Sequence, residues 1–180
     1  MSFTLLITFA CVAIGVSFIC SILEAVLLST SLSNVAIMES DGKRFAHLWR
    51  KYKTEPERPL TAILTLNTIA HTVGALGVGT EVAKLYAGSP ELDMIMGIAS
   101  AILTLGVLLF SEILPKTIGT IYAKKLAVPA AFILQLLIII LIWIVAPIEW
   151  TRKLFPTPEQ ETVSREELVA LVDVAEEEKD

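Results

Sequence analysis

Long apolar stretches dominate the chain. They cover residues 3–28, 60–86, 94–114 and 128–148. Each stretch is close to the ~20 residues that an α-helix needs to cross ~30 Å of hydrocarbon. The apolar residues come in blocks and not at the spacing of a soluble core, so the pattern predicts an all-α integral membrane protein and excludes a soluble domain.

Composition and cysteine positions agree with this interpretation. Hydrophobic residues make up 54% of the 180 residues, and the mean hydropathy is +0.71. Residues 1–6 contain no Lys or Arg and no small-residue cleavage site follows the first stretch, so we do not expect a removable signal peptide. Cys11 and Cys20 fall on opposite faces of a helix, which predicts packing roles and not a disulfide.

The charges between the stretches predict the orientation. Residues 40–59 hold several basic residues, whereas residues 85–93 hold Glu91 and Asp93 and no base. By the positive-inside rule the first of these loops is cytoplasmic, and the second lies outside together with the N-terminus. The basic residues of the cytoplasmic loop are Lys43, Arg44, Arg50, Lys51, Lys53 and Arg58.

The fourth apolar stretch has basic residues on both sides. They are Lys116, Lys124 and Lys125 before it, and Arg152 and Lys153 after it. Positive charge at both ends predicts that both ends face the cytoplasm. We therefore interpret residues 128–145, bounded by Pro129 and Pro147, as a juxtamembrane helix that is re-entrant, kinked or in-plane. Three helices then cross the membrane, although length alone would make this stretch a fourth span.

Short amphipathic helices are expected on the cytoplasmic side. The first helix should continue from residue 3 to about residue 38 and project from the membrane. Apolar side chains then recur at helical spacing among basic ones, at Phe45, Leu48, Trp49 and Tyr52. This pattern suits either a helix on an anionic membrane surface or a cytoplasmic hairpin packed on its neighbours. Pro59 suits the first turn of the second apolar helix.

The end of the chain differs in character from the rest. Residues 1–155 form the predicted transmembrane domain, and residues 156–180 are polar and acidic. Ser164 and Glu167 form a possible capping box, followed by apolar residues at helical spacing. We expect an acidic cytoplasmic linker helix whose apolar face needs a partner.

Three polar residues interrupt the predicted spans: Ser21, Asn67 and Glu112. At 1.5 Å per residue, Ser21 and Glu112 each lie ~27 Å from the outer end of their helix, and Asn67 lies ~10 Å from the inner end. All three can therefore meet in the inner half of the membrane. A hydroxyl, an amide carbonyl and a carboxylate are hard oxygen ligands of the kind that Mg²⁺ and Ca²⁺ select. Polar groups at this depth mark an ion path.

Further polar or small residues near this depth form a second tier of candidates. They are Ser17, Glu24, His71, Gly74 and Ser111, with Pro115 and Lys116 as a structural turn. Structural roles compete with ion binding at several positions: Ser21 and Asn67 can join helices, and Glu112 can pair with Lys116 at i+4. Glu24 either pairs with a basic residue or faces a water-filled vestibule. His71 suits a hydrogen bond between helices better than a metal site.

Glycines cluster in the second apolar stretch, at positions 74, 77 and 79. They either let another helix approach closely or let the helix break and expose backbone carbonyls. A nucleotide-binding glycine loop is not expected, because no strand precedes these glycines.

Three segments in order carry a family resemblance. They are Ser21-Ile-Leu-Glu24-Ala25-Val-Leu-Leu-Ser29, the Asn67 segment, and Phe110-Ser-Glu112-Ile-Leu-Pro115-Lys116. Together they resemble the membrane domain of the cyclin M (CNNM) and CorC magnesium transporter family. The resemblance implies a homodimer in the cell membrane, with three spanning helices and a juxtamembrane helix per subunit. It also implies that residues 156–180 lead into cytoplasmic CBS domains in the full-length chain.

The resemblance implies a function and a set of ligands. Ser21, Asn67 and Glu112 would bind Mg²⁺ during export, with Na⁺ entry as the coupled process. Two positions depart from the family pattern: His71 stands where a second Asn is common, and Ser111 where Gly is frequent. His71 leaves a Na⁺ site at that position unsupported, since imidazole is a poor partner for hard cations.

Two functions follow from these observations. The first is Mg²⁺ efflux coupled to Na⁺ influx, and the alternative is a Mg²⁺ sensor or anchor that regulates cytoplasmic domains or a partner channel without transport. We expect no enzymatic activity, because no glycine-flanked nucleophile motif accompanies Ser21 or Ser111 for use with His71. We expect no nucleic-acid partner.

Overall fold

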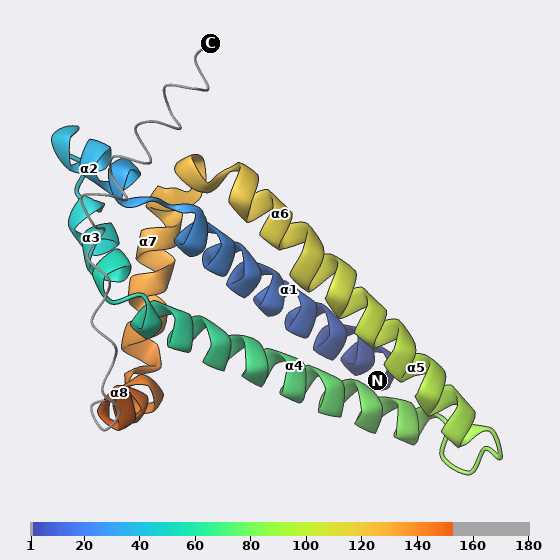
Figure 1. Cartoon of the computed structure of the whole chain (residues 1–180). Helices are drawn as coiled ribbons and strands as arrows, with labels where there is room; N and C mark the ends of the chain where they lie inside the picture. The colour runs from blue at the N-terminus through green and yellow to red at the C-terminus, as the bar shows by residue number, and fades with distance from the viewer. Residues whose placement is uncertain (1, 153–180) are drawn as a thin grey trace, which may run out of the picture. The chain divides into compact units, whose positions relative to one another are not determined.

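A computed structural model describes residues 2–152, and the regular structure in that range is helical (Figure 1). The helices are α1 (Ser2–Ser29), α2 (Leu32–Ser40), α3 (Ala46–Thr54), α4 (Glu57–Leu85), α5 (Leu92–Gly106), the π-helix η1 (Val107–Ile113), α6 (Leu114–Ile121), α7 (Ala123–Ile140) and α8 (Ile142–Arg152). The contacts described below lie within the compact unit that ends at Val145. The predicted linker helix at 156–180 and the domain boundary at residue 155 lie outside the described residues.

Four helical stretches are long and apolar enough to cross a membrane. They are Phe3–Ser29, Glu57–Leu85, Leu92–Ile121 and Ala123–Ile140, and they match the four predicted apolar stretches. The third is longer than predicted, because Pro115 lies in the first turn of α6 and does not end the helical run there. Pro59 lies in the first turn of α4, as predicted.

Helix α1 is central in this compact unit. It contacts α4, η1, α6 and α7, and Figure 1 shows it between α4 and the run from α5 to α6. Its buried residues Leu23, Val26 and Leu27 form a core with Ala131 and Leu134 of α7. None of the described residues of α5 is buried, so this helix offers its apolar side chains to the surroundings, as a membrane helix does.

The first helix ends earlier than predicted. It stops at Ser29 instead of continuing to residue 38, and α2 begins at Leu32. The Ser31 backbone is extended, and the Ser31 hydroxyl accepts a hydrogen bond from the Asn34 amide at 3.2 Å. Serine favours a helix N-cap over a helix interior because its hydroxyl competes for nearby backbone groups. The cap at Ser31 therefore starts a new helix.

Helix α3 packs its apolar face on α7. The Trp49 indole donates to the Ala127 carbonyl at 2.9 Å, and the Tyr52 hydroxyl donates to the Ala131 carbonyl at 3.3 Å. Both aromatic side chains are buried. The packing of this hairpin on its neighbours is therefore confirmed, this apolar face does not lie on a membrane surface, and the cytoplasmic position stays a prediction.

Two polar contacts hold the α2–α3 hairpin in place. The Arg50 guanidinium donates to both carboxylate oxygens of Glu39 and holds the pKa of that carboxyl below its usual range. The Lys53 ammonium donates to the Leu27 carbonyl at 3.1 Å, near the C-terminus of α1. Partial burial lowers the pKa of Lys53, while the negative end of the α1 dipole favours the charged amine at this position.

Glycines allow α1 to approach its neighbours closely. A Cβ at Gly119 would lie 2.7 Å from the Cβ of Ala25 and 2.9 Å from the Ile22 carbonyl. Gly74 and Gly77 of α4 are similarly covered by Ala13 and Phe9. Because α4 is unbroken through residue 85, close approach is the role of Gly74 and Gly77, and helix breakage is excluded.

The predicted bounds of the fourth apolar helix are wrong. Pro129 and Pro147 lie inside α7 and α8 instead of flanking one helix, and the junction is at Leu141. Helix α7 begins at Ala123, before the predicted start at residue 128. The amides of Lys125 and Leu126 both donate to the Tyr122 carbonyl and form its first turn. By length and composition α7 qualifies as a span. Its position as a juxtamembrane helix stays a prediction.

Replacing Gly119 by Ala should weaken the packing of α6 on α1. The new methyl group meets backbone atoms of Ile22, which cannot rotate away, and overpacking of this kind costs about 1–3 kcal/mol. The expected result is a lower melting temperature in detergent. Gly97→Ala is the matched control, because a Cβ at Gly97 meets nothing within 4 Å. Equal melting temperatures for the two variants would contradict this role of Gly119.

The topology of α7 can be tested with single cysteines at Lys125 and Arg152 in a background without Cys11 and Cys20. If α7 does not cross the membrane, both cysteines react with a membrane-impermeant maleimide only from the cytoplasmic side. Labelling of one position from outside and the other from inside would show that α7 is a fourth span.

Candidate cation site

The site is centred on Glu112, which lies in the π-helical turn η1. The Leu114 amide donates to the Leu109 carbonyl, five residues earlier, where an α-helix would use a carbonyl four residues earlier. Such wide turns are rare and occur mainly at functional sites. Pro115 follows directly and has no amide hydrogen, so one carbonyl of the preceding turn lacks its usual donor. The wide turn and the proline together give this segment oxygen atoms that the helix itself does not use.

Polar side chains from α1, α4 and α6 surround Glu112. Its Oε1 accepts a hydrogen bond from the Asn67 Nδ2 at 3.3 Å and lies 3.9 Å from the His71 Nε2. Its Oε2 lies 3.2 Å from the Lys116 ammonium, which also lies 3.2 Å from the Oε2 of Glu24. One lysine therefore bridges two carboxylates from different helices. The pairing of Glu112 with Lys116 was one of the alternatives that the sequence left open.

Two buried oxygen atoms of the predicted ligands have no hydrogen-bond partner among the described residues. They are the Ser21 Oγ and the Asn67 Oδ1. Ser21 is 1% exposed, and Asn67 uses its amide nitrogen on Glu112, which leaves its oxygen as an acceptor. A buried polar atom without a partner costs about 1–3 kcal/mol. Each of the two oxygens can therefore accept a further partner, such as a cation or water.

The second-tier residues join the helices around the site. The Ser17 hydroxyl lies 2.7 Å from the His71 Nε2 and connects α1 to α4. The Ser111 hydroxyl donates to the Ile14 carbonyl at 3.2 Å and connects η1 to α1. Gly74 lies against Ala13, as described above. His71 therefore forms a hydrogen bond between helices, as the sequence predicts.

Glu24 takes part in two features. It pairs with Lys116, and it also lines a pocket of about 260 Å³ together with Glu57, Leu60 and Thr61. The ion pair predicted for Glu24 is thus present, and a water-filled vestibule at this pocket stays a prediction. Sequence reasoning did not single out Glu57. The sequence signal that could have identified Glu57 is a charged residue at the start of a long apolar helix.

The candidate metal ligands at this site are oxygen atoms of several chemical types. Within residues 2–152, no cluster of three or more His, Cys, Asp or Glu side chains could hold a metal ion. A cation at this site would instead use the Glu112 carboxylate, the Ser21 hydroxyl, the Asn67 carbonyl oxygen and backbone carbonyls. This is an oxygen set with few charges, which suits Mg²⁺, Ca²⁺ or Na⁺ better than transition metals.

Comparison with known proteins finds several relatives of this chain. It is 33% identical over 133 residues to "UPF0053 protein sll1254" of Synechocystis sp., covering 72% of this chain and 37% of that protein. It is 34% identical over 110 residues to "UPF0053 inner membrane protein YfjD" of Escherichia coli, covering 59% of this chain and 24% of that protein. A "UPF0053 protein" of Haemophilus influenzae is 26% identical over 163 residues, covering 84% of this chain and 37% of that protein.

The chain therefore spans between a quarter and two fifths of the length of these relatives. A family model described as "Cyclin M transmembrane N-terminal domain" (CNNM) matches residues 6–180, nearly the whole chain. The four apolar helices agree with a membrane domain of this kind. The chain belongs to the cyclin M transmembrane N-terminal domain family and is a multi-pass membrane protein.

Proposed function

We propose that this domain transports Mg²⁺ across the cell membrane through the site around Glu112. The observation that carries the proposal is the combination of one carboxylate on a π-helical turn with two buried oxygens, of Ser21 and Asn67, that have no protein partner. Ionisable groups at membrane depth are costly and mark ion paths by default. The oxygen donor set favours a hard cation, and a single carboxylate with neutral ligands favours the moderate affinity that release requires.

Lys116 supplies an internal positive charge to this site. Glu24, Glu112 and Lys116 together carry one net negative charge, and the ammonium lies equally close to both carboxylates. A Mg²⁺ ion binding to Glu112 would repel the ammonium, which Glu24 can retain. The lysine therefore competes with the ion and limits its affinity. A monovalent ion such as Na⁺ would compete less strongly with Lys116, and Na⁺ influx is the coupled process in this proposal.

The pocket beside Glu24 offers the cation a route to one side of the membrane. Glu24 and Glu57 bring two carboxylates to its lining, and Thr61 adds a hydroxyl. Carboxylates around a concave opening concentrate cations. With the basic loop at residues 40–59 on the cytoplasmic side, this pocket is the cytoplasmic entrance, and the transport is efflux.

The proposed assembly is a homodimer with the N-terminus outside. Large apolar side chains on α5 are exposed in the single chain, including Ile98, Ile102 and Leu105. Such faces pack against lipid or a second copy. Because the relatives are much longer than this chain, a role as a Mg²⁺ sensor that regulates further domains is the second candidate function. The two functions share the same binding site and differ in flux.

Transport is tested by reconstituting the chain in liposomes and measuring Mg²⁺ movement with a fluorescent indicator. In vesicles where the cytoplasmic face of the protein points into the lumen, Mg²⁺ should leave the lumen. An opposing Na⁺ gradient, directed into the lumen, should accelerate this exit. Empty liposomes are the control. Mg²⁺ binding in calorimetry without any Mg²⁺ flux would contradict transport and favour the sensor.

The site is tested by Glu112→Gln, which keeps the size of the side chain but removes the charge nearest the proposed ion. Mg²⁺ affinity should fall by more than about tenfold in calorimetry, a change of ~1.4 kcal/mol. Ser21→Ala and Asn67→Ala each remove one neutral oxygen that water can replace, so each should weaken binding less.

Lys116→Gln separates the competing roles of the lysine. If Lys116 competes with the ion, this variant binds Mg²⁺ at least as tightly as the parent chain.

Glu91→Gln, in the turn between α4 and α5, is a matched control for the carboxylate that Glu112→Gln removes. Full Mg²⁺ binding by a folded Glu112→Gln variant would place the site elsewhere.

A further inference from the structure

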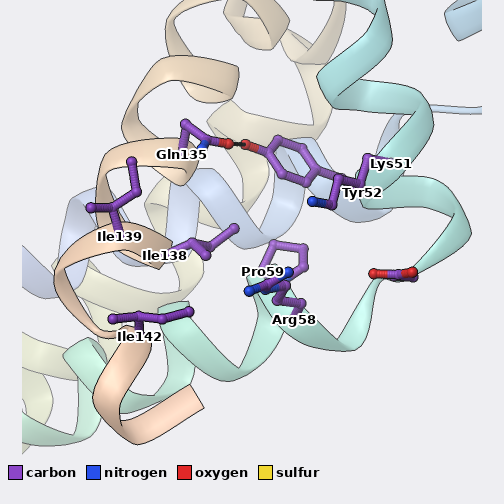
Figure 2. Close-up of a pocket in the computed structure, with 9 residues that line it drawn as sticks. Lys51, Tyr52, Arg58, Pro59, Gln135, Ile138, Ile139 and Ile142 are labelled. Atoms are coloured by element: carbon purple, nitrogen blue, oxygen red, sulfur yellow. Dashed lines mark hydrogen bonds between the residues drawn. The ribbon is translucent and has the colours of Figure 1, made fainter. Parts of the chain in front are cut away.

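A second pocket lies apart from the residues of the cation site, among α3, the first turn of α4 and α7 (Figure 2). Its volume is about 200 Å³. Two basic residues, Lys51 and Arg58, and one acidic residue, Glu55, line it together with Tyr52 and Gln135. Figure 2 shows the opposite wall, formed by Ile138, Ile139 and Ile142. The pocket thus joins a charged rim to an apolar wall.

The polar side of the pocket presents hydrogen-bond donors. The single proton of the Tyr52 hydroxyl is shared between the Ala131 carbonyl and the Gln135 Oε1 at 3.1 Å, which leaves the Gln135 amide nitrogen as a donor (Figure 2). Burial raises the pKa of Tyr52 to about 12, so this hydroxyl stays protonated at neutral pH. Lys51 and Arg58 each bring a positive charge to the lining, and Glu55 brings one negative charge.

The apolar side continues onto the exposed surface of α7. Ile139 belongs to the pocket wall and is 58% exposed, and its neighbour Ile140 is also exposed. Trp143 follows on α8, at 86% exposure. Tryptophan is enriched where a membrane meets water, because its ring is apolar and its N–H is polar. The pocket therefore lies where an apolar helix face passes into a basic, water-exposed segment.

We propose that this pocket binds the phosphate headgroup of an anionic phospholipid, with the acyl chains lying along the exposed isoleucines of α7. Basic pockets between membrane helices on the cytoplasmic side suit such headgroups. The volume accommodates a phosphate and its glycerol but not a whole lipid, so the chains must remain outside, against Ile139. The proposal rests on the predicted cytoplasmic position of residues 40–59, and it does not depend on Mg²⁺ transport.

A bound lipid would stabilise the contact between three elements. Lys51 belongs to α3, Arg58 to α4 and Gln135 to α7. The same α4 carries Asn67 and His71 to the cation site. Lipid binding would thus fix the inner end of a helix that contributes to ion binding.

The proposal is tested by titrating the purified full chain in detergent with phosphatidylglycerol and counting bound lipids by native mass spectrometry. Phosphatidylcholine and glycerol 1-phosphate are separate arms. We expect phosphatidylglycerol to bind more tightly than phosphatidylcholine, and glycerol 1-phosphate alone not to displace it at equal concentration. A photoactivatable phosphatidylglycerol should cross-link to residues 51–59 or 135–142.

Two pairs of variants connect the binding to this pocket. Lys51→Gln should weaken phosphatidylglycerol binding by about fivefold, since one basic group near a lipid surface contributes about that much. Lys43→Gln is the charge-matched control, because Lys43 pairs with Asp41 outside the pocket. Ile139→Ala should weaken lipid binding more than Leu136→Ala, an exposed α7 residue that does not line the pocket.

Several results would overturn the proposal. Equal binding of phosphatidylcholine would show an apolar groove without headgroup recognition. Displacement of phosphatidylglycerol by glycerol 1-phosphate at equal concentration would show a small-anion site. Equal effects of Lys51→Gln and Lys43→Gln, or cross-links confined to other helices, would place the lipid elsewhere. Each of these outcomes can occur whether or not the chain transports Mg²⁺, so the two proposals fail separately.

Discussion

The interaction on which the site depends is the pairing of Lys116 with Glu24 and Glu112. Two carboxylates among apolar helices are costly unless their charge is balanced, and a single ammonium at 3.2 Å from each provides that balance. The bridge joins α1 to the run of η1 and α6, while Asn67 connects α4 to the same carboxylate. Close helix approach is needed for such short contacts. Gly119 against Ala25, and Gly74 against Ala13, allow it.

The proposed ion site depends on polar atoms near the π-helical turn that have no protein partner. Glu112 is satisfied by Asn67 and Lys116, yet the Ser21 and Asn67 oxygens remain without protein partners. A fully paired polar network would be a structural feature, whereas a network with unused oxygens can accept a cation. In the proposed transport the lysine keeps the ion affinity moderate, because every ion that reaches Glu112 meets a positive charge already in place.

The basic segment of residues 40–59 has two roles in the structure. Its aromatic residues Trp49 and Tyr52 face inward and anchor α3 to carbonyls of α7. Its basic residues remain at the rim, where Lys51 and Arg58 line the pocket on the apolar surface of α7. The proposed lipid pocket therefore combines Lys51 of α3 with Arg58 of α4, beside the aromatic residues that pack α3 on α7.

The sequence by itself determined the all-helical membrane class and the four apolar stretches, because hydrophobic length and helical rise are properties of a single segment. The matched depth of Ser21, Asn67 and Glu112 stays a prediction. Tertiary structure decided the rest. The Ser31 cap ended α1 early, α3 packed on α7, and the bounds of α7 did not follow its prolines. The contact of Lys116 with Glu24 joins residues far apart in the chain. Spacing along one helix predicts neighbours at i+4, but only helix packing brings together side chains from different helices.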